Sequence, residues 1–360
     1  MKTKVAIVLP DFHFGGAQVM VCRLVSHLNL EKVDAEVIVC GQEKGNDLER
    51  AIVEHGVPIR YLGKTKGFSA KVTADLFREL DRFHPQVIHT HLSACVYCAP
   101  WVIVRRRTML HTVHNMPQHE LIRPKRLVMK AMYRFGCAVP VGISREIYEL
   151  TEAYYHPKKQ PELVYNPVNI KQFTSMPKRE HTAFTVLNVG RLSEQKNQQL
   201  LIRAFSGLHK LNAETELLIL GEGPKRQELE DLIREEGLGE CVHLEGKKEK
   251  PEEYFARADV FALSSIYEGL PLVLLEAMAA SLPIVSTNVG GVKDIVSENG
   301  ILTENKNEEQ LKDALIRLME NPDLRRQMGG TSFAEVQKYD SAVIADEYAA
   351  LYEKYARNKF

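Results

Sequence analysis

Short apolar runs alternate with helical patterns along almost the whole chain, and this alternation is the feature that most limits its fold. In the first half, patterns typical of buried strands occur at residues 5–9, 35–40, 59–62, 87–91, 109–114 and 139–143. Helical patterns lie between them, for example at residues 69–83. Because parallel strands need crossover connections, a regular order of strand and helix predicts a doubly wound parallel sheet.

The second half repeats this alternation after a short strand and linker at residues 161–168. Strand patterns occur at residues 185–189, 217–220, 242–244, 260–263 and 283–286. Helical segments without further strands follow at residues 308–320, 322–338 and 341–355. A chain of 360 residues is long enough for two domains of ordinary size. We therefore expect α/β domains at residues 1–165 and 166–340, each with its own parallel sheet.

Composition limits the class of protein. Lys and Arg together number 47, as do Asp and Glu, so no net field attracts nucleic acid. The six Cys lie mostly in apolar runs, which favours reduced cytosolic thiols over a disulfide framework. The apolar run at residues 4–10 is too short for a signal peptide, and the one at residues 94–104 cannot span a bilayer. These features predict a cytoplasmic protein, with at most a peripheral attachment to the inner face of the membrane.

The stretch at residues 264–277 combines backbone donors with two carboxylates. Pro271 stands where a helix begins, since its fixed φ suits the first helical position. The N–H groups of Gly269 and Leu270 lie near this helix start, where the helix dipole favours an anion. Glu268 and Glu276 flank the turn and can accept hydrogen bonds from hydroxyl groups. A sugar nucleotide, with a diphosphate between two polyols, fits this set; two ordinary surface carboxylates near a helix start are the alternative.

Two cations follow the first strand of the second domain. Arg191 falls at the carboxyl end of that strand, and Lys196 precedes Asn197, a residue type that often caps helices. Cations beside a positive helix end suit a diphosphate. An ordinary pair of surface cations is the alternative.

Three more strand-to-helix turns carry glycines. Gly15 and Gly16 open the helix after the first strand, where paired glycines let a ligand or another backbone come close. Their spacing is not Gly-x-Gly-x-x-Gly, so the dinucleotide fingerprint is absent and a nicotinamide dehydrogenase is disfavoured. In the second domain, Glu222 stands between two glycines, and Gly246 and Lys247 end the next strand. Each turn can line a ligand pocket or be a tight turn and nothing more.

The histidines His89, His91 and His114 stand at predicted carboxyl ends of strands, where doubly wound sheets bind ligands. We therefore expect them to face a cleft. His89 and His91 point the same way on one strand, as two metal ligands would, but no nearby carboxylate or cysteine completes a metal site. Cys95 and Cys98 form a C-x-x-C without a second pair, so we assign them to the core.

Basic residues gather in the first half at Arg105, Arg106 and Arg107, and again along a helical pattern at residues 123–134. The second segment begins at Arg123 and ends at Arg134. Within it, Arg126, Lys130 and Arg134 repeat at intervals of four residues and so lie on one face of the helix. A basic amphipathic helix can lie on an anionic membrane surface. A solvated helix face is the alternative.

The order of these motifs resembles that of the retaining glycosyltransferases of family 4, which have the GT-B fold. The matching elements are Gly15-Gly16, the strand ending in His114, Gly190-Arg191 with Lys196, Gly221-Glu222-Gly223-Pro224, and Glu268-Gly269-Leu270-Pro271 with Glu276. Each motif alone is weak, but the ordered set is specific and spans nearly the whole chain. The resemblance implies two Rossmann-like domains that face each other across a cleft, with a final helix at residues 341–360 on the first domain.

The resemblance also implies roles for the site residues. Arg191 and Lys196 would hold the diphosphate of the donor, and Glu276 would accept from the ribose hydroxyls. Glu268 would lie near the transferred sugar, beside the two backbone N–H groups that follow it. From the first domain, His114 would reach the sugar and the paired glycines would approach the phosphates. We take Glu268, His114, Arg191 and Lys196 as the catalytic candidates.

The reaction that the resemblance implies is transfer of a hexose or N-acetylhexosamine from a nucleoside diphosphate sugar, which we expect to be a UDP-sugar. The acceptor would be a hydroxyl of a glycan or lipid-linked sugar, as in capsule or exopolysaccharide synthesis. Retention of configuration and independence of metal ions come with the resemblance, since the two cations supply the charge for the leaving group. A non-hydrolysing sugar-nucleotide epimerase and a non-catalytic sugar-nucleotide-binding subunit are the alternatives, and the charged set favours transfer.

Overall fold

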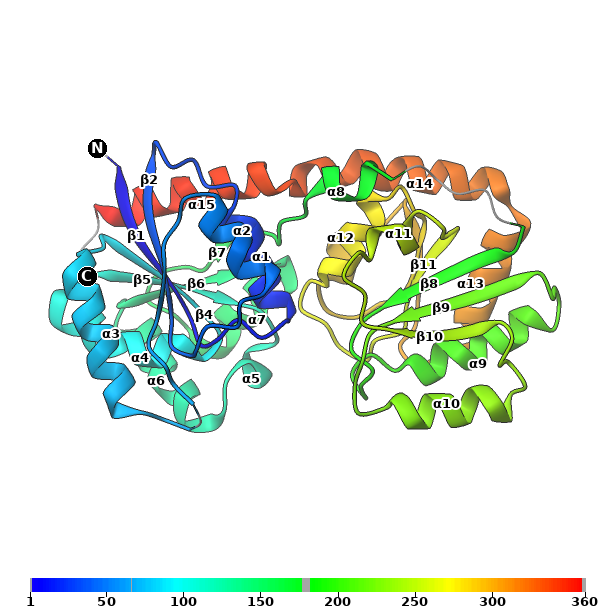
Figure 1. Cartoon of the computed structure of the whole chain (residues 1–360), viewed down its shortest axis with the longest axis horizontal. Helices are drawn as coiled ribbons and strands as arrows, with labels where there is room; N and C mark the ends of the chain where they lie inside the picture. The colour runs from blue at the N-terminus through cyan, green and yellow to red at the C-terminus, as the bar shows by residue number, and fades with distance from the viewer. Residues whose placement is uncertain (1, 66, 177–181, 358–360) are drawn as a thin grey trace. The chain divides into compact units, whose positions relative to one another are not determined.

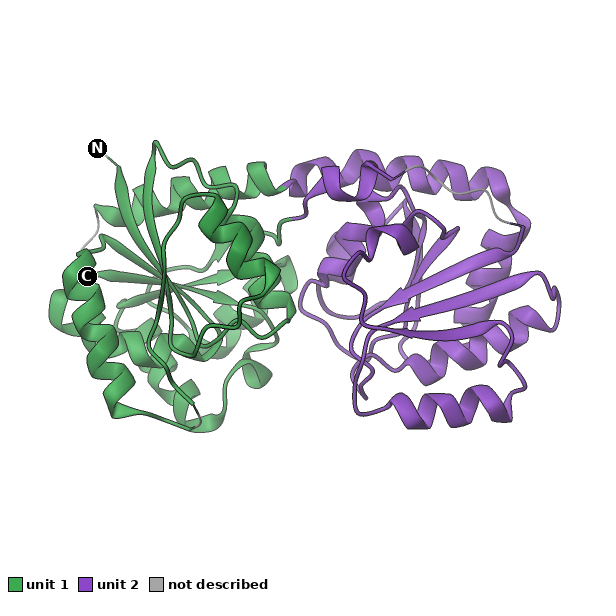
Figure 2. Cartoon of the chain, viewed as in Figure 1, with its two compact units in different colours: residues 1–167, 341–360 green, residues 168–340 purple. Residues whose placement is uncertain are grey.

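The computed structural model describes residues 2–65, 67–176 and 182–357. The chain divides into two compact units (Figure 2). Unit 1 consists of residues 1–167 and 341–360, and unit 2 consists of residues 168–340. This boundary lies two residues beyond the one expected from the sequence, since unit 1 runs to residue 167 rather than 165.

Unit 1 contains a parallel sheet in the order β3-β2-β1-β4-β5-β6-β7 (Figure 1). Its strands are β1 (Thr3–Leu9), β2 (Val33–Val39), β3 (Ile59–Tyr61), β4 (Val87–His91), β5 (Thr108–Val113), β6 (Ala138–Gly142) and β7 (Glu162–Leu163). Its helices are α1 (Gly16–Val25), α2 (Asp47–Glu54), α3 (Ala70–Phe83), α4 (Cys95–Arg105), α5 (Pro117–Glu120), α6 (Arg123–Arg134), α7 (Arg145–Tyr155) and α15 (Ser341–Ala356). The strand order reverses between β1 and β4, and ligands of doubly wound sheets bind at such a reversal.

The central strands of unit 1 are buried at nearly every position because helices cover both faces of the sheet (Figure 1). The helices have local start signals: Ser69 Oγ accepts from the N–H of Val72 at α3, and Ser144 Oγ accepts from that of Ile147 at α7. Helix α15 packs against α1, β1 and β4. The C-terminal helix therefore covers the part of the sheet that contains the strand reversal.

Unit 2 contains a parallel sheet in the order β10-β9-β8-β11-β12-β13. Its strands are β8 (Phe184–Val189), β9 (Thr215–Leu220), β10 (Val242–Gly246), β11 (Val260–Leu263), β12 (Ile284–Thr287) and β13 (Gly300–Thr303). Its helices are α8 (Ile170–Thr174), α9 (Gln198–His209), α10 (Arg226–Glu235), α11 (Glu252–Phe255), α12 (Leu272–Ala279), α13 (Glu308–Glu320) and α14 (Pro322–Val336). Here the strand order reverses between β8 and β11.

The structure confirms the predicted fold class, two Rossmann-like α/β domains with parallel sheets. It adds β13 and α7, which the sequence patterns did not single out. Asn197 occupies the N-cap position of α9, as expected, but it has φ 48° and its side chain makes no cap hydrogen bond. Pro271 likewise flanks α12, whose first residue is Leu272. The end of the predicted final helix, residues 358–360, lies outside the described residues.

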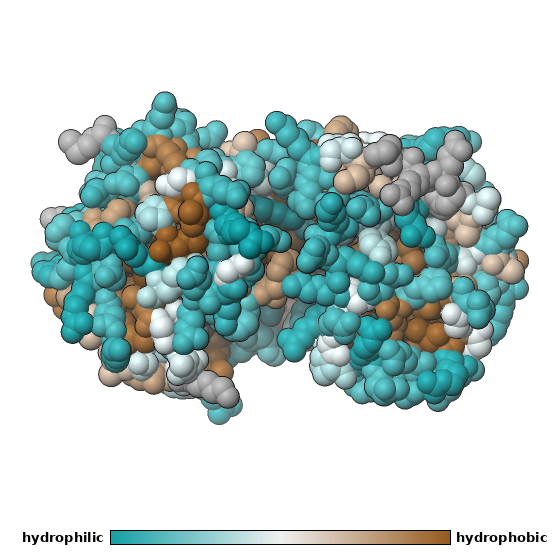
Figure 3. Space-filling view, viewed as in Figure 1, coloured by the Kyte–Doolittle hydropathy of each residue, from teal (hydrophilic) through white to brown (hydrophobic). Residues whose placement is uncertain are grey.

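The surface of the chain is largely hydrophilic on the face that Figure 3 displays, with separate apolar patches on each unit. Within the described residues, we find no helix that combines the length and the hydropathy needed to cross a bilayer. The apolar run at residues 94–104 forms most of α4, where Tyr97, Cys98 and Val102 are buried in the core of unit 1.

Candidate active site

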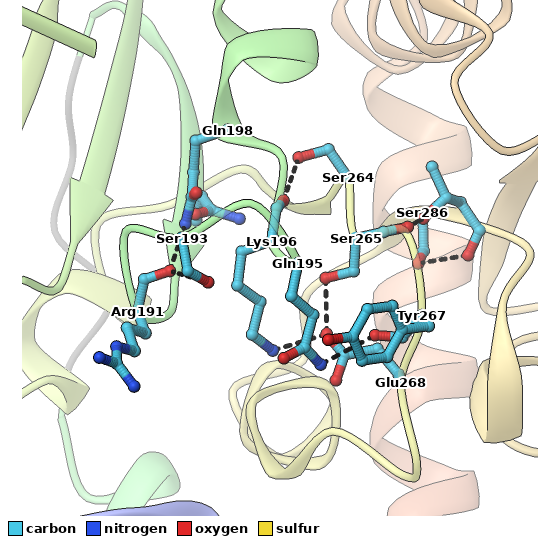
Figure 4. Close-up of polar contacts among 12 residues, drawn as sticks. Arg191, Ser193, Gln195, Lys196, Gln198, Ser264, Ser265, Tyr267, Glu268 and Ser286 are labelled. Carbon is cyan, nitrogen blue, oxygen red and sulfur yellow. Dashed lines mark hydrogen bonds and ion pairs between the residues drawn. The ribbon is translucent and has the colours of Figure 1, made fainter. Parts of the chain in front are cut away.

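Two loops meet at the strand reversal of unit 2, because β8 and β11 are adjacent in the sheet (Figure 4). The loop after β8 holds Gln195, whose carbonyl oxygen accepts from the N–H of Ile266 at 2.8 Å and whose Nε2 donates to the carbonyl oxygen of Tyr267 at 2.9 Å. Ser264 Oγ at the end of β11 donates to the carbonyl oxygen of Lys196 at 3.0 Å. Hydrogen bonds of the backbone and of side chains thus fix the two loops against each other, and these loops contain the candidate residues.

Lys196 and Glu268 form an ion pair across these loops, with 2.6 Å between Lys196 Nζ and Glu268 Oε1. Ser265 Oγ donates to the same carboxylate oxygen at 2.5 Å. The pair is shielded from water, since only 17% of the Lys196 side chain and 6% of the Glu268 side chain are exposed. From the sequence, Lys196 was assigned to the diphosphate and Glu268 to the transferred sugar, and their contact with each other was not predicted. Lys196 and Glu268 stand 72 residues apart in the chain, so only the adjacency of β8 and β11 brings them together.

Arg191 is exposed at the end of β8 and points away from this pair (Figure 4). Its carbonyl oxygen accepts from Gln198 Nε2 at 3.1 Å, which fixes the backbone. Among the described residues, no carboxylate pairs with the Arg191 guanidinium. The loop after β8 therefore offers an exposed cation in addition to the buried ammonium of Lys196.

The backbone after Glu268 is held by a tight contact with a short 3₁₀ helix, η2 (Gly290–Asp294). Gly269 accepts from the N–H of Gly291 at 2.7 Å. Gly290 has φ 57°, and a Cβ there would lie 2.0 Å from the carbonyl oxygen of Glu268. Only glycine fits such a contact and such a dihedral angle. This second constraint on the Glu268 loop had not been predicted from the sequence.

The helix that follows this loop, α12, begins two residues after Leu270 and contains Glu276, of which 8% is exposed. Both residues are buried on the same loop-to-helix segment as Glu268 and Gly269. Glu276 is thus a buried carboxylate and not an ordinary surface residue. This burial argues against the surface alternative for both Glu268 and Glu276.

The glycines of the turn after β9 are needed for close packing on the loop after β8. A Cβ at Gly221, which has φ 136°, would lie 1.9 Å from the carbonyl oxygen of Gly190. A Cβ at Gly223 would lie 2.1 Å from that of Leu192. Glu222, between them, is exposed and its carboxylate accepts from Arg226 at 2.8 Å. The turn therefore supports the loop that carries Arg191 and Lys196.

The turn after β10 joins the same group of loops. The carbonyl oxygen of Gly246 accepts from the N–H of Gly221 at 2.8 Å, and Gly246 has φ 72°. Lys247 follows it and is exposed. The carboxyl ends of β8, β9, β10 and β11 thus gather all the unit 2 candidates at one edge of the sheet.

The remaining candidates belong to unit 1. Gly15 has an extended backbone, with φ −163°, and precedes α1, whose first residue is the exposed Gly16. His114 follows β5 and is half-buried. Burial lowers the pKa of His114 to about 3, so its imidazole is neutral near pH 7. Gly15, Gly16 and His114 all lie at carboxyl ends of strands of the first sheet.

The expectation that His89 and His91 face a cleft is wrong, because both are fully buried. His89 Nδ1 lies 2.7 Å from the hydroxyl of Tyr352, and its Nε2 lies 2.7 Å from Thr112 Oγ1. Tyr352 belongs to α15, which covers this face of the sheet. Burial lowers the pKa of both histidines well below the ordinary value, so they are neutral core residues.

The structure also bears on the metal and thiol alternatives. Within the described ranges, no three His, Cys, Asp or Glu side chains are grouped as metal ligands would be. Cys95 and Cys98 are buried and unpaired, and burial raises the pKa of both thiols. They are core residues, as predicted.

Two family models match this chain in succession. The model described as Glycosyltransferase Family 4 matches residues 14–172, and the model described as Glycosyl transferases group 1 matches residues 171–333. Together the two models cover residues 14–333, and the chain belongs to the GT-B glycosyltransferases that contain these two domains. The family assignment agrees with both the fold and the order of the motifs.

Curated relatives match parts of the chain. An N-acetylgalactosaminyltransferase of Campylobacter jejuni, named for its substrate N-acetylgalactosamine-N,N'-diacetylbacillosaminyl-diphospho-undecaprenol, is 32% identical over 203 residues. This match spans 55% of the chain and about half, 54%, of that relative. The N-acetyl-alpha-D-glucosaminyl L-malate synthase of Bacillus anthracis is 25% identical over 284 residues, which is 74% of each protein.

Solved structures share the fold over the whole chain. The crystal structure of Anabaena Alr3699/HepE in complex with UDP superposes with a TM-score of 0.84. The superposition covers 98% of this chain and 100% of that one, at 18% identity. The sucrose-phosphate synthase of Thermosynechococcus elongatus has a TM-score of 0.79 at 20% identity, over 98% and 99% of the two chains. At such identities the likeness concerns the fold alone.

Proposed function

We propose that this protein transfers a sugar from a UDP-sugar to a hydroxyl group of a glycan or lipid-linked acceptor, with retention of configuration. The observation that carries the proposal is the group of charges at the strand reversal of unit 2. There the exposed Arg191 and the shielded Lys196–Glu268 pair lie on two interlocked loops that end β8 and β11. The alternatives, an epimerase and a non-catalytic binding subunit, account less well for the grouping of Arg191, Lys196 and Glu268.

The reaction requires stabilisation of two charges. Cleavage of the anomeric C–O bond builds positive charge on the sugar and negative charge on the leaving diphosphate. Arg191 and Lys196 stabilise the negative charge on the diphosphate, and these two cations take the place of a divalent metal ion. Glu268 lies beside Lys196 and faces the sugar, and Glu276 accepts from the ribose hydroxyls. The acceptor hydroxyl attacks from the face that the nucleotide leaves, and a leaving phosphate oxygen takes its proton.

The choice of donor and acceptor draws on the relatives as well as on the site. The HepE crystal contains UDP, and the Campylobacter relative is named for transfer to a diphospho-undecaprenol acceptor. We assign a UDP-sugar donor and an acceptor of the cell-surface glycan type by this likeness. Glu222, Gly246 and Lys247, at the ends of β9 and β10, are assigned to the nucleoside side of the donor.

Nucleotide binding tests the donor assignment. UDP is expected to raise the melting temperature of the protein, and GDP or ADP to raise it less, because the nucleoside pocket would select the base. UDP without any added divalent metal should stabilise the protein as well as UDP with magnesium. Stabilisation by GDP or ADP but not by UDP would overturn the donor assignment. Dependence of the shift on a metal would overturn the metal-independent mechanism.

Membrane attachment is the second part of the proposal, and its motivation lies on α6. The apolar side chains of Leu127 on α6 and of Phe135, which caps the end of α6, are 68% and 73% exposed, and Arg123 and Arg134 are exposed on the same helix. Exposed apolar groups among basic ones suit the boundary of an anionic bilayer. Arg105, in contrast, is engaged with Asp81, with 2.6 Å between Arg105 Nη2 and Asp81 Oδ2, so the run at residues 105–107 contributes less than α6.

Co-sedimentation with anionic vesicles at low salt tests this attachment. Replacing Arg126, Lys130 and Arg134 by Ala is expected to weaken binding roughly 100-fold, since each basic residue near such a surface contributes about 1 kcal/mol. The matched control replaces Lys210, at the end of α9, together with Arg234 and Arg317 on helix surfaces of unit 2, and should bind as the wild type does. Equal sedimentation of all three proteins would favour the solvated-face alternative.

A further inference from the structure

His114 is hydrogen-bonded to a second imidazole, and this contact determines where its proton resides. His91 Nδ1 lies 3.0 Å from His114 Nε2, so one of the two nitrogens donates and the other accepts. His91 is fully buried at the end of β4, and its other nitrogen, Nε2, has no hydrogen-bond partner among the described residues. Both histidines are neutral near pH 7, because burial lowers the pKa of each.

The unpartnered nitrogen of His91 decides between the two possible arrangements. A neutral imidazole carries its single proton on one nitrogen. If that proton were on His91 Nε2, a buried N–H would have no acceptor, which is rare and costly in proteins. If the proton is on His91 Nδ1, it makes the hydrogen bond to His114, and only a lone pair is left unpartnered. The second arrangement leaves His114 with its own proton on Nδ1.

We propose that His91 is a positioning residue that fixes His114 as the neutral tautomer protonated at Nδ1, so that the ring nitrogen of His114 left for a ligand is an N–H donor and not a lone pair. This inference rests on the proposed function for its consequence in catalysis, while the tautomer itself follows from the contacts of unit 1. His114 is then a donor that does not change its charge during turnover. It neither accepts nor releases the proton of the acceptor hydroxyl.

His91 is itself held in place by a buried network that α15 completes. Its ring lies 4.2 Å from that of His89, centroid to centroid. Both nitrogens of His89 are engaged, with Tyr352 and Thr112, and Thr112 Oγ1 lies 3.1 Å from the hydroxyl of Tyr348. Rings packed and bonded in this way cannot rotate freely, which keeps the 3.0 Å contact with His114 fixed.

The tautomer can be measured on the wild-type protein. In protein labelled with ¹⁵N-histidine, long-range ¹H–¹⁵N correlation distinguishes protonated from unprotonated ring nitrogens, and His114→Gln identifies the His114 signals by their loss. We expect a protonated Nδ1 and an unprotonated Nε2 for His114, unchanged between pH 8 and pH 5.5. A protonated Nε2 with a bare Nδ1, or a charged ring at pH 6, would overturn the proposal.

Kinetics test the consequence for catalysis. His91→Leu removes the donor and is expected to lower kcat about tenfold, the equivalent of one neutral hydrogen bond, with little change in the KM for the donor. His91→Asn keeps an N–H donor near the position of Nδ1 and should recover most of that loss. His111→Leu is the matched control: His111 is equally buried on β5, but its Nδ1 bonds to Thr90 and not to His114, so turnover should stay near that of the wild type.

The proposed function and the positioning role of His91 can be refuted separately. If the protein turns over no nucleotide sugar while His114 shows a protonated Nδ1, the proposed function is wrong and the tautomer stands. If the wild type is active and His91→Leu matches it in kcat, the positioning role of His91 is wrong and the proposed function stands.

Discussion

Replacement of Lys196 by Ala is expected to lower kcat by about 10²–10³, with a much smaller loss of UDP affinity. The reason is that the charge on the leaving diphosphate increases as the anomeric bond breaks, so the Lys196 ammonium contributes most in the transition state. In the free protein this ammonium pairs with Glu268 at 2.6 Å. Steady-state kinetics and calorimetry with UDP on the same variant measure the two effects separately.

Two further variants make this prediction specific. Lys210→Ala removes an exposed cation just beyond the C-terminal end of α9 and should leave both quantities unchanged. Glu276→Ala should raise the KM for the donor with less change in kcat, because ribose hydroxyls do not react. Lys196→Ala also leaves the Glu268 carboxylate buried without its cation, so the melting temperature must be measured and the assays run where the variant is folded. A loss of UDP affinity as large as the loss of kcat would contradict the transition-state role.

Replacement of Gly290 by Ala is expected to destabilise the protein by about 3–5 kcal/mol and to remove activity. The added Cβ would lie 2.0 Å from the carbonyl oxygen of Glu268, and the backbone would keep an unfavourable φ of 57°. Both the loop that carries Glu268 and the 3₁₀ helix η2 must move to relieve this contact. Chemical denaturation followed by circular dichroism gives the free energy of unfolding.

The matched control for Gly290→Ala is Gly330→Ala. Gly330 lies inside α14 with nothing within 4 Å of an added Cβ, so alanine there should stabilise the helix by roughly 0.5–1 kcal/mol. Activity of the control should equal that of the wild type. A Gly290→Ala variant with wild-type stability and activity would show that the Glu268 loop does not depend on this contact.

Much of the fold could be predicted from the sequence, because strands covered on both faces are apolar runs that stand out between turns. Residues 5–9 and 260–263 are of this kind, and they form most of β1 and all of β11. The strand β13 escaped prediction, since its apolar run is only the two residues between Gly300 and Thr303. The C-terminal helix was recognised as a helix, but its tyrosines gave no sign that they bond to His89 and Thr112.

The parts of the site that could not be predicted are contacts between distant segments. The Lys196–Glu268 pair depends on the adjacency of β8 and β11 in the sheet, which the sequence order does not state. The need for glycine at position 290 depends on the path of another loop. His91 was expected to face a ligand because it ends a strand, but α15 covers that face of the sheet. In each case the deciding neighbour lies far away in the chain.

The measurement that tests the central claim most directly is UDP release from UDP-sugars by the wild type and by Glu268→Gln, with calorimetry of UDP binding to both. The account predicts that the wild type consumes a UDP-sugar in the presence of an acceptor, and that Glu268→Gln binds UDP with nearly the same affinity but turns over far less sugar. Loss of UDP binding in Glu268→Gln would place this carboxylate with the nucleotide and not with the sugar. Unchanged turnover in that variant would contradict the site proposed for unit 2.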